Sequence, residues 1–282
     1  MYKDILVYTG SGVTARRMSE YAATFASIFK ARLAGLIVEV DFVDYSAIDR
    51  AMTDADKALV VSILLKQRAP VHDAAVRDSI VFENAARHCN VSYNTSFKTC
   101  VSADVPAVVT EMARLYDCVL LPSNEEVGGF HIPIIEEVLF NSGRPLIILP
   151  TDHDAMCSLG HVIVAWDGSR PATRAVHDAL PILREATVVD ITTITEEKPL
   201  SQLPSGPDLV RHLKAHDIRA RYQEVHLGNT PVGEQIMDEA LHRGAGLLVM
   251  GAYGHSRIRQ IVFGGATRTI LKKPRLPVML SL

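Results

Sequence analysis

A glycine-punctuated segment, residues 251–265, is the clearest candidate for ligand chemistry in the sequence. It follows an apolar run of strand length (247–250) and leads into a pattern of helical period (266–273). Glycine lets the backbone approach a ligand closely, and a helix N-terminus presents free N–H groups and the positive end of its dipole. This order therefore predicts a site for an anion, most often a phosphate. The glycines are Gly251, Gly254, Gly264 and Gly265.

The same glycines also fit a simpler explanation, a tight loop in which they serve only the turn. Three polar residues of the segment, His255, Arg257 and Arg259, lie close to the expected anion site. An arginine there could pair with a phosphate, because its guanidinium group suits phosphate geometry. The alternative is a solvated loop, and the sequence leaves both interpretations open.

Asp167 is a second candidate, because it ends the first strand of the second half of the chain. In parallel sheets, ligands bind at the carboxyl ends of the strands. A carboxylate there can accept hydrogen bonds from a ribose hydroxyl or a base amine. The alternative is structural, with Asp167-Gly168 as a turn and Ser169 as a helix N-cap. The two roles are compatible, and Asp167 and the glycine segment are expected at one sheet edge, facing one pocket.

Alternating strand and helix patterns are expected to position these residues. The apolar runs lack strict alternation, which is typical of parallel strands buried on both faces. The expected strands are 5–8, 33–40, 91–101, 118–121, 145–149, 161–166, 187–194, 219–227, 247–250 and 277–281. The expected helices are 14–30, 45–88 with a break near Ala69-Pro70, 106–116, 132–140, 172–183, 207–216, 231–242 and 266–273. In the long helical stretch, an apolar stripe (Leu59, Val60, Ile63, Leu64) is expected to pack on the sheet or on a partner subunit.

The two halves of the chain form an internal repeat. Gly10-Ser11 aligns with Gly168-Ser169, and at the same offset Arg16 aligns with Arg174. A repeat of this length indicates a duplicated domain rather than a solenoid. The predicted fold class is α/β, with two tandem, open-twisted, parallel five-stranded sheets flanked by helices. The predicted domains are 1–150 and 161–282, joined by a linker over 151–160.

Composition excludes several classes of function. The chain has 282 residues and a net charge of -3, which gives no reason to expect nucleic acid or an anionic membrane as a partner. We see no secretion signal and no apolar run long enough to span a bilayer. The four cysteines lie far apart without a CxxC pair, so we expect free thiols in a reducing cytoplasm and no metal site.

Catalytic signatures are also missing from the sequence, including a P-loop lysine and a nucleophile elbow.

At the level of motifs, the chain resembles the universal stress protein family, in its tandem two-domain type. The resemblance covers nearly the whole chain and is strongest over residues 162–169, 228–231 and 247–256. The nucleotide motif of that family is G-x2-G-x9-G-[S/T], and Gly251, Gly254 and Gly264 match its spacing. The resemblance implies a Rossmann-like fold of the adenine nucleotide α-hydrolase type.

The resemblance also implies a ligand, ATP, which Mg²⁺ would accompany. The nucleoside would lie near Asp167, with residues 192–194 flanking the base. The phosphates would lie over the glycine loop and the helix start. The implied cofactor-binding set is Asp167, Gly251, Gly254, His255, Gly264, Gly265, Ala266 and Thr267.

The chain departs from the family pattern in both halves. Gly265 stands at the Ser/Thr position, so a hydroxyl contact worth roughly 1.5–3 kcal/mol is lost, and Thr267 or Ser256 could replace it. In the first half, Thr9 stands where Asp167 stands, and residues 122–126 (PSNEE) replace the first glycine pair. Proline removes a donor and two glutamates repel phosphate, so we expect no nucleotide in the first half.

Three functional hypotheses follow. The first is a cytoplasmic stress-response protein whose C-terminal domain binds ATP, with at most slow hydrolysis. Its domains would pack as an internal pseudo-dimer through their fifth strands, and a homodimer of chains is left open. The second is a nucleotide-independent interaction or small-ligand-binding module. The third, an enzyme of the related adenine α-hydrolase group, is disfavoured because the sequence lacks its HxGH and SGGxDS signatures.

Overall fold

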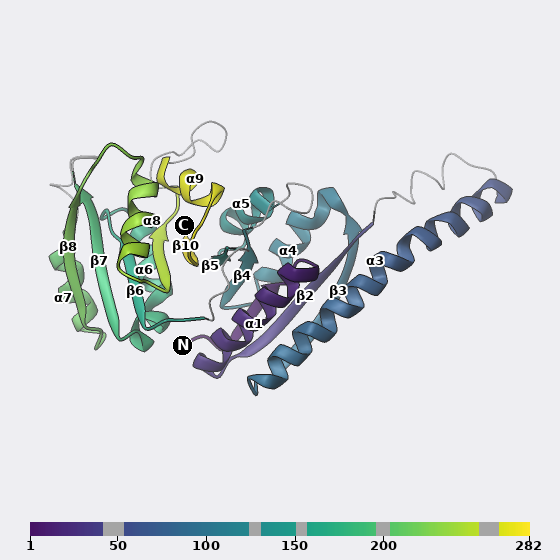
Figure 1. Ribbon diagram of the computed structural model, residues 1–282, viewed down its shortest axis with the longest axis horizontal. Coiled ribbons are helices and arrows are strands. Elements are labelled where there is room, and N and C mark those ends of the chain that lie inside the picture. The colour runs from purple at the N-terminus through teal and green to yellow at the C-terminus, as the bar shows by residue number, and fades with distance from the viewer. Residues whose placement is uncertain (42–53, 124–130, 151–156, 196–203, 254–264) are drawn as a thin grey trace.

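The computed structural model describes residues 1–41, 54–123, 131–150, 157–195, 204–253 and 265–282, with residues 54–67 and residue 131 described as backbone only. The whole chain builds one twisted sheet with helices on both faces (Figure 1). The predicted α/β class is confirmed. Nearly every expected strand and helix is present, with ends shifted by a few residues.

The first half of the chain supplies five strands in the order β3-β2-β1-β4-β5, all paired in parallel. The central strands carry apolar runs rather than alternating residues because helices cover both of their faces. Its elements are β1 (Asp4–Tyr8), α1 (Gly12–Phe29), β2 (Arg32–Asp41), α3 (Asp54–His88), β3 (Tyr93–Val101), a 3-10 turn (Ser102–Asp104), α4 (Val105–Ala113), β4 (Cys118–Pro122), α5 (His131–Asn141) and β5 (Leu146–Leu149).

The second half repeats this arrangement with the strand order β10-β9-β6-β7-β8, again parallel throughout. Gly10 and Gly168, which the repeat aligned, both adopt positive φ, +67° and +71°. The elements of this half are β6 (His161–Ala165), α6 (Arg170–Glu185), β7 (Val188–Thr195), α7 (Gly206–Lys214), β8 (Ala220–His226), α8 (Val232–His242), β9 (Leu247–Gly251), α9 (Gly265–Lys272) and β10 (Val278–Ser281).

The fifth strands of the two halves join the sheets. β5 and β10 pair antiparallel, with Met279 opposite Ile147, so the ten strands form a single sheet. The predicted packing of the two halves through their fifth strands is therefore confirmed. This pairing satisfies the backbone groups of an edge that each half would otherwise expose. The predicted linker, 151–160, lies partly outside the described residues, and the domain limits stay a prediction.

Two hydrophobic cores lie on opposite faces of the sheet, and each contains residues from both halves. One lies under α1 and α6, and the other under α4, α5, α8 and α9. The Tyr2 hydroxyl donates a hydrogen bond to the Asp178 carbonyl at 2.6 Å, which ties the N-terminus to α6. The two halves therefore share their hydrophobic cores and do not pack as separate units.

Helix α3 departs from the prediction, because it runs without a break from Asp54 to His88 and contains Pro70. Proline removes one helical hydrogen bond, but Pro70 is exposed, so water can reach the carbonyl that loses its partner. Further along, the Phe82 ring packs on β2 at Gly35, where a Cβ would lie only 2.7 Å from the ring. The side chains of the apolar stripe over 59–64 lie outside the described residues.

No helix in the part of the chain that the structure describes is long and apolar enough to cross a membrane. The four cysteines are free thiols, as expected. Burial raises the pKa of the Cys157 thiol to about 12, so this thiol is a packing group rather than a nucleophile.

Candidate functional site

The candidate site lies at the carboxyl ends of two neighbouring strands, β6 and β9. These strands pair in parallel with Ala165 opposite Met250. Asp167 and Ala252 each follow two residues later, so the chain leaves both strands at the same edge of the sheet. The structure therefore brings Asp167 and the start of the glycine segment together, as the sequence suggested.

Asp167 begins a tight turn that starts α6. Its Oδ1 accepts a hydrogen bond from the Ser169 N–H at 2.9 Å, and Gly168 between them has φ +71°. Ser169 is the N-cap of α6, and its hydroxyl accepts from the Ala172 N–H at 3.3 Å. The turn and N-cap roles are thus both present. They leave the half-buried Asp167 at the sheet edge, where a ligand could also reach it.

Trp166 lies between the end of β6 and Asp167 and is a core residue. Trp166 is 6% exposed, and its indole N–H donates to the Pro204 carbonyl at 3.0 Å. The Thr193 hydroxyl donates to the Trp166 carbonyl at 2.8 Å, which links this point to β7. Trp166 therefore packs in the core beside the candidate site.

Gly251 ends β9 directly against the first turn of α6. A Cβ at this position would lie 2.3 Å from the Ala172 nitrogen and 2.4 Å from the Pro171 carbonyl carbon. Both neighbours are backbone atoms, so they cannot move aside as a flexible side chain would. Gly251 is therefore required by helix packing, whether or not a ligand binds.

We expect Gly251→Ala to destabilise the protein by about 1–3 kcal/mol, because the added methyl group forces the backbone of α6 away from β9. The free energy of unfolding from urea titration measures this change. Gly160→Ala is the matched control, since a Cβ there meets no atom within 4 Å in the part of the chain that the structure describes. Equal stability of the two variants would contradict the packing role of Gly251.

Three residues of the predicted site, Gly254, His255 and Gly264, lie outside the described residues, as do Ser256, Arg257 and Arg259. The structure resumes at α9, whose first residue is Gly265. The predicted strand before the glycine segment and the predicted helix after it are therefore both present. The first N–H groups of an α-helix have no hydrogen-bond acceptor within the helix. In α9 these groups belong to Gly265, Ala266 and Thr267.

Thr267 connects the two ends of the glycine segment. Its side chain is 3% exposed, and its hydroxyl oxygen accepts a hydrogen bond from the Tyr253 N–H at 3.4 Å. The Ala252 N–H donates to the Ser281 carbonyl at 2.9 Å. The hydroxyl of Thr267 thus already positions the chain that leaves β9.

Tyr253 links the candidate site to the other half of the protein. It has φ +57°, and its hydroxyl donates to Glu136 Oε1 of α5 at 3.3 Å. Its ring centroid lies 4.8 Å from that of Phe140, also on α5. Burial, followed by the nearby Glu136 carboxylate, raises the pKa of Tyr253 well above its usual value. Local sequence patterns do not indicate this contact, because its partners are more than a hundred positions apart.

Two acidic side chains, Asp78 and Glu39, lie near the equivalent edge of the sheet in the first half. The Asp78 carboxylate of α3 accepts a hydrogen bond from the Gly12 N–H, in the first turn of α1, at 3.1 Å. Glu39 is 5% exposed and lies 2.9 Å from His72 Nδ1. Pro122 ends β4 where Gly251 ends β9. A helix N-terminus that could attract an anion is thus already occupied by a carboxylate of the same chain.

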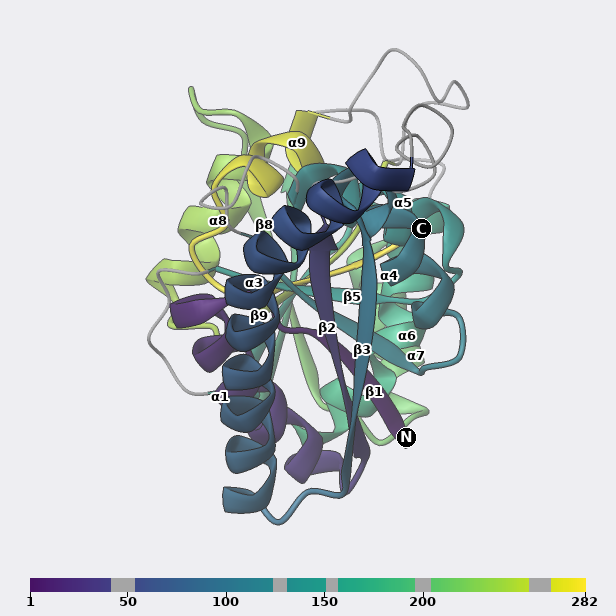
Figure 2. The ribbon, with the colours of Figure 1, turned by 90° about the vertical axis from the view of Figure 1, so that its right-hand side faces the viewer.

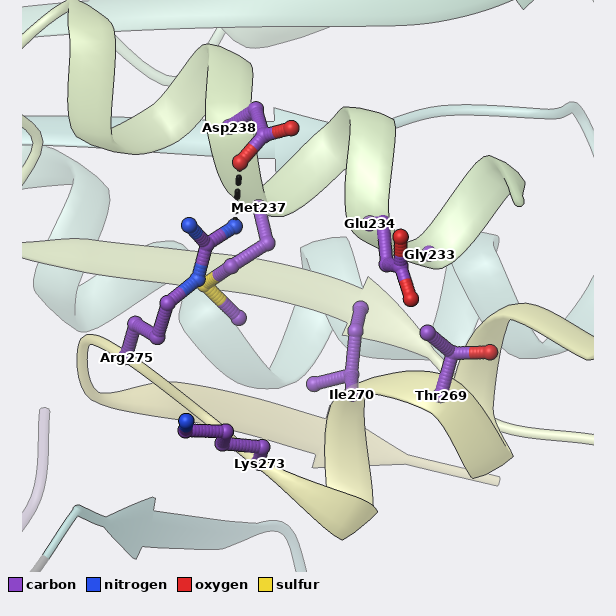
Figure 3. Close-up of a pocket in the computed structure, with 8 residues that line it drawn as sticks. All are labelled: Gly233, Glu234, Met237, Asp238, Thr269, Ile270, Lys273 and Arg275. Carbon is purple, nitrogen blue, oxygen red and sulfur yellow. Dashed lines mark hydrogen bonds and ion pairs between the residues drawn. The ribbon is translucent and has the colours of Figure 1, made fainter. Parts of the chain in front are cut away.

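A separate hollow of about 400 Å³ lies between α8 and α9 (Figure 3). Arg275 there forms an ion pair with Asp238. Two cations and two carboxylates line the hollow, so it does not select for an anion. It contains none of the predicted site residues. The lining residues are Gly233, Glu234, Met237, Asp238, Thr269, Ile270, Lys273 and Arg275.

One family model matches the second half of the chain. Residues 159–281 match the universal stress protein family. A universal stress protein from Archaeoglobus fulgidus DSM 4304 has a similar solved structure, with a TM-score of 0.68 and 15% identity over 99% of this chain and 95% of that chain. A functionally unknown protein from Pseudomonas aeruginosa PAO1 has a TM-score of 0.57 and 14% identity over 99% of this chain and 92% of that chain.

At such identities these structures show a shared fold, and that fold extends over both halves of the chain. Among curated proteins, none matches the sequence significantly.

Proposed function

Since residues 159–281 match the universal stress protein family, we propose that this half of the protein binds ATP at the carboxyl ends of β6 and β9, as part of a stress response. Asp167 would accept hydrogen bonds from the nucleoside. The glycine segment and the first turn of α9 would receive the phosphates.

One observation carries this proposal: the strand β9 ends beside the Asp167 turn, and the chain resumes, after the glycine segment, as the N-terminus of α9. Backbone N–H groups and the positive end of the dipole there favour an anion. Gly265 is exposed, and a Cβ there would meet no atom of the described residues within 4 Å. This openness beside the α9 backbone supports a phosphate at this position.

The first half is proposed to bind no nucleotide. The carboxylate of Asp78 holds the N–H of Gly12 at the start of α1, and this buried carboxylate would repel a phosphate. Thr9, in place of Asp167, is fully buried and directs its hydroxyl to the Gly10 carbonyl at 3.1 Å. This half would serve as the structural partner of the second.

Hydrolysis of ATP at this site is expected to be slow. If ATP binds with Mg²⁺, the ion would neutralise phosphate charge, and the residues of this chain would only hold and orient the nucleotide. Among the described residues at the edge, Asp167 is the one carboxylate of the predicted set, and it is engaged in the turn before α6. We therefore propose binding with at most slow hydrolysis.

The test is the nucleotide content of freshly purified protein, measured by acid release and chromatography, together with calorimetric titration with ATP. We expect close to one adenine nucleotide per chain. Gly254→Glu should remove it, because a carboxylate placed in the glycine segment repels the phosphates.

Gly160→Glu is the matched control for this experiment. It adds the same charge before β6, at the amino ends of the strands, in open space. Nucleotide retained by Gly160→Glu and lost by Gly254→Glu would support the proposed site. A wild-type protein that neither retains nucleotide nor binds ATP at about millimolar concentration would overturn the proposal.

The missing hydroxyl at Gly265 favours a second candidate, a stress-related interaction or small-ligand-binding module that needs no nucleotide. The hydroxyl of Thr267 would then serve only to join Tyr253 to α9. An absence of ATP binding in the experiment above would select this candidate.

A further inference from the structure

Helix α3 has an outward face that no described segment covers. It packs on α1, β2 and β3, and it lies in front of the sheet in Figure 2. Its inward residues are buried: Ala75 is 6% exposed, and Phe82 and Ala86 are 0% exposed. Between them lie outward residues at a spacing of three or four, which is the spacing of one helix face.

This outward face combines apolar residues with charges of both signs. Val76 is 36% exposed and Ile80 is 52% exposed, although large aliphatic side chains are usually buried. We call the set the α3 face. Its members are Asp73, Val76, Arg77, Ile80, Glu83, Asn84 and Arg87.

The charges of the α3 face alternate in sign along the helix. In order they are Asp73, Arg77, Glu83 and Arg87, and their positions are symmetric about Ile80. Arg87 already contacts Glu83 at 2.7 Å on its own helix, and both also contact Tyr93 of β3, while Glu83 keeps 30% of its side chain exposed. Within the described residues, Asp73 and Arg77 have no ion-pair partner.

We propose that the α3 face binds a second copy of this chain, with the two helices antiparallel and a two-fold axis at Ile80. In that arrangement Asp73 faces the partner's Arg87, and Arg77 faces the partner's Glu83. Ile80 meets the partner's Ile80 at the axis. A parallel, in-register pair would instead place every charge opposite its own copy, so the charge order selects the antiparallel arrangement.

The arrangement is isologous, because each contact occurs twice across the two-fold axis. The matching residues span about 21 Å of helix, at 1.5 Å per residue. Such a contact is smaller than a standard interface, and much of it depends on exposed charges. The dimer should therefore be weak and sensitive to salt, since salt screens such charges.

Sedimentation equilibrium on the full chain tests the proposal. The wild-type protein should form dimers as its concentration rises to about 200 μM, and dimerisation should weaken several-fold between about 0.05 M and 0.5 M NaCl. A wild-type protein that remains monomeric over this range would overturn the proposal.

Charge reversal identifies the face. Arg77→Glu and Glu83→Arg should each weaken self-association by roughly tenfold or more, because two attractive pairs become repulsive. A mixture of the two variants should form a mixed dimer, since a carboxylate then faces a guanidinium group in both of these contacts. Arg184→Glu, an exposed reversal on α6, is the control and should leave the dimer unchanged.

Circular dichroism and thermal unfolding of each variant show that α3 and the fold persist. A dimer that survives Arg77→Glu at wild-type strength, or a mixture that stays monomeric, would rule out this face. Because the readout is assembly alone, the result does not depend on nucleotide binding.

Discussion

Replacing Gly265 with serine is expected to tighten ATP binding by roughly 10- to 150-fold, the equivalent of one hydrogen bond to a charged group. Serine supplies the hydroxyl that the family motif has at this position. Among the described residues there is room for it, because a Cβ at Gly265 meets none of their atoms within 4 Å. Titration calorimetry with ATP on the wild type and on Gly265→Ser measures the change.

Gly160→Ser is the matched control for this gain of affinity, since its side chain also enters open space, but at the other end of β6. Its ATP affinity should equal that of the wild type. An unchanged dissociation constant in Gly265→Ser, in a protein that does bind ATP, would place the phosphates away from the start of α9. The nucleotide proposal would survive that outcome, but the assignment of Gly265 would not.

Removing the Asp190 carboxylate is expected to cost roughly 2–4 kcal/mol of stability. Asp190 lies on β7 with its side chain 2% exposed. It accepts hydrogen bonds from Arg221 at 2.8 and 3.1 Å and lies 3.0 Å from His161 Nε2. Asp190→Ala leaves these partners uncompensated, although Arg221 is exposed enough to regain water. Urea unfolding at neutral pH measures the loss.

The pH dependence of this effect follows from the pKa of Asp190. Burial raises that pKa, but hydrogen bonds from Arg221 and His161 outweigh burial, and the net shift is downward. A lowered folded-state pKa gives stability that is present above the unfolded value of about 3.9 and lost as the pH falls through the folded value. The difference between wild type and Asp190→Ala should therefore be constant near neutral pH and shrink below about pH 4.

Asp238→Ala is the control for this prediction. Asp238 also pairs with an arginine, Arg275, but its side chain is 57% exposed, and exposed pairs contribute about 0–1 kcal/mol. An equal loss in the free energy of unfolding for Asp190→Ala and Asp238→Ala would mean that burial does not strengthen the ion pairs of Asp190.

The contact between Tyr253 and α5 joins the two halves of the chain beside the candidate site. Tyr253, the second of the two residues between Gly251 and Gly254, contacts Glu136 and Phe140 of the other half. The chain that leaves β9 at the candidate site is therefore held in part by residues of the N-terminal half.

The sequence by itself determined the class of fold and most of its elements. Apolar runs without alternation predicted parallel strands buried on both faces, and the repeat of Gly10 at Gly168 predicted two similar halves. These features are local, or recur at a constant offset, so they can be read without knowing which distant residues touch. The positions of Asp167 and Gly251 at one sheet edge followed from the same logic, because parallel strands end together.

The tertiary structure alone decided the contacts between distant residues. The sequence suggested a break at Pro70, yet α3 continues, because its packing on α1 and β2 outweighs the loss of one hydrogen bond. The carboxylate of Asp190 lies within a predicted strand, and its side-chain partners come from two other strands and from the end of α8. Gly251 looked like a ligand-loop glycine, and only the position of α6 shows that packing also requires it. Such contacts depend on which elements the fold places side by side, a choice that local patterns do not encode.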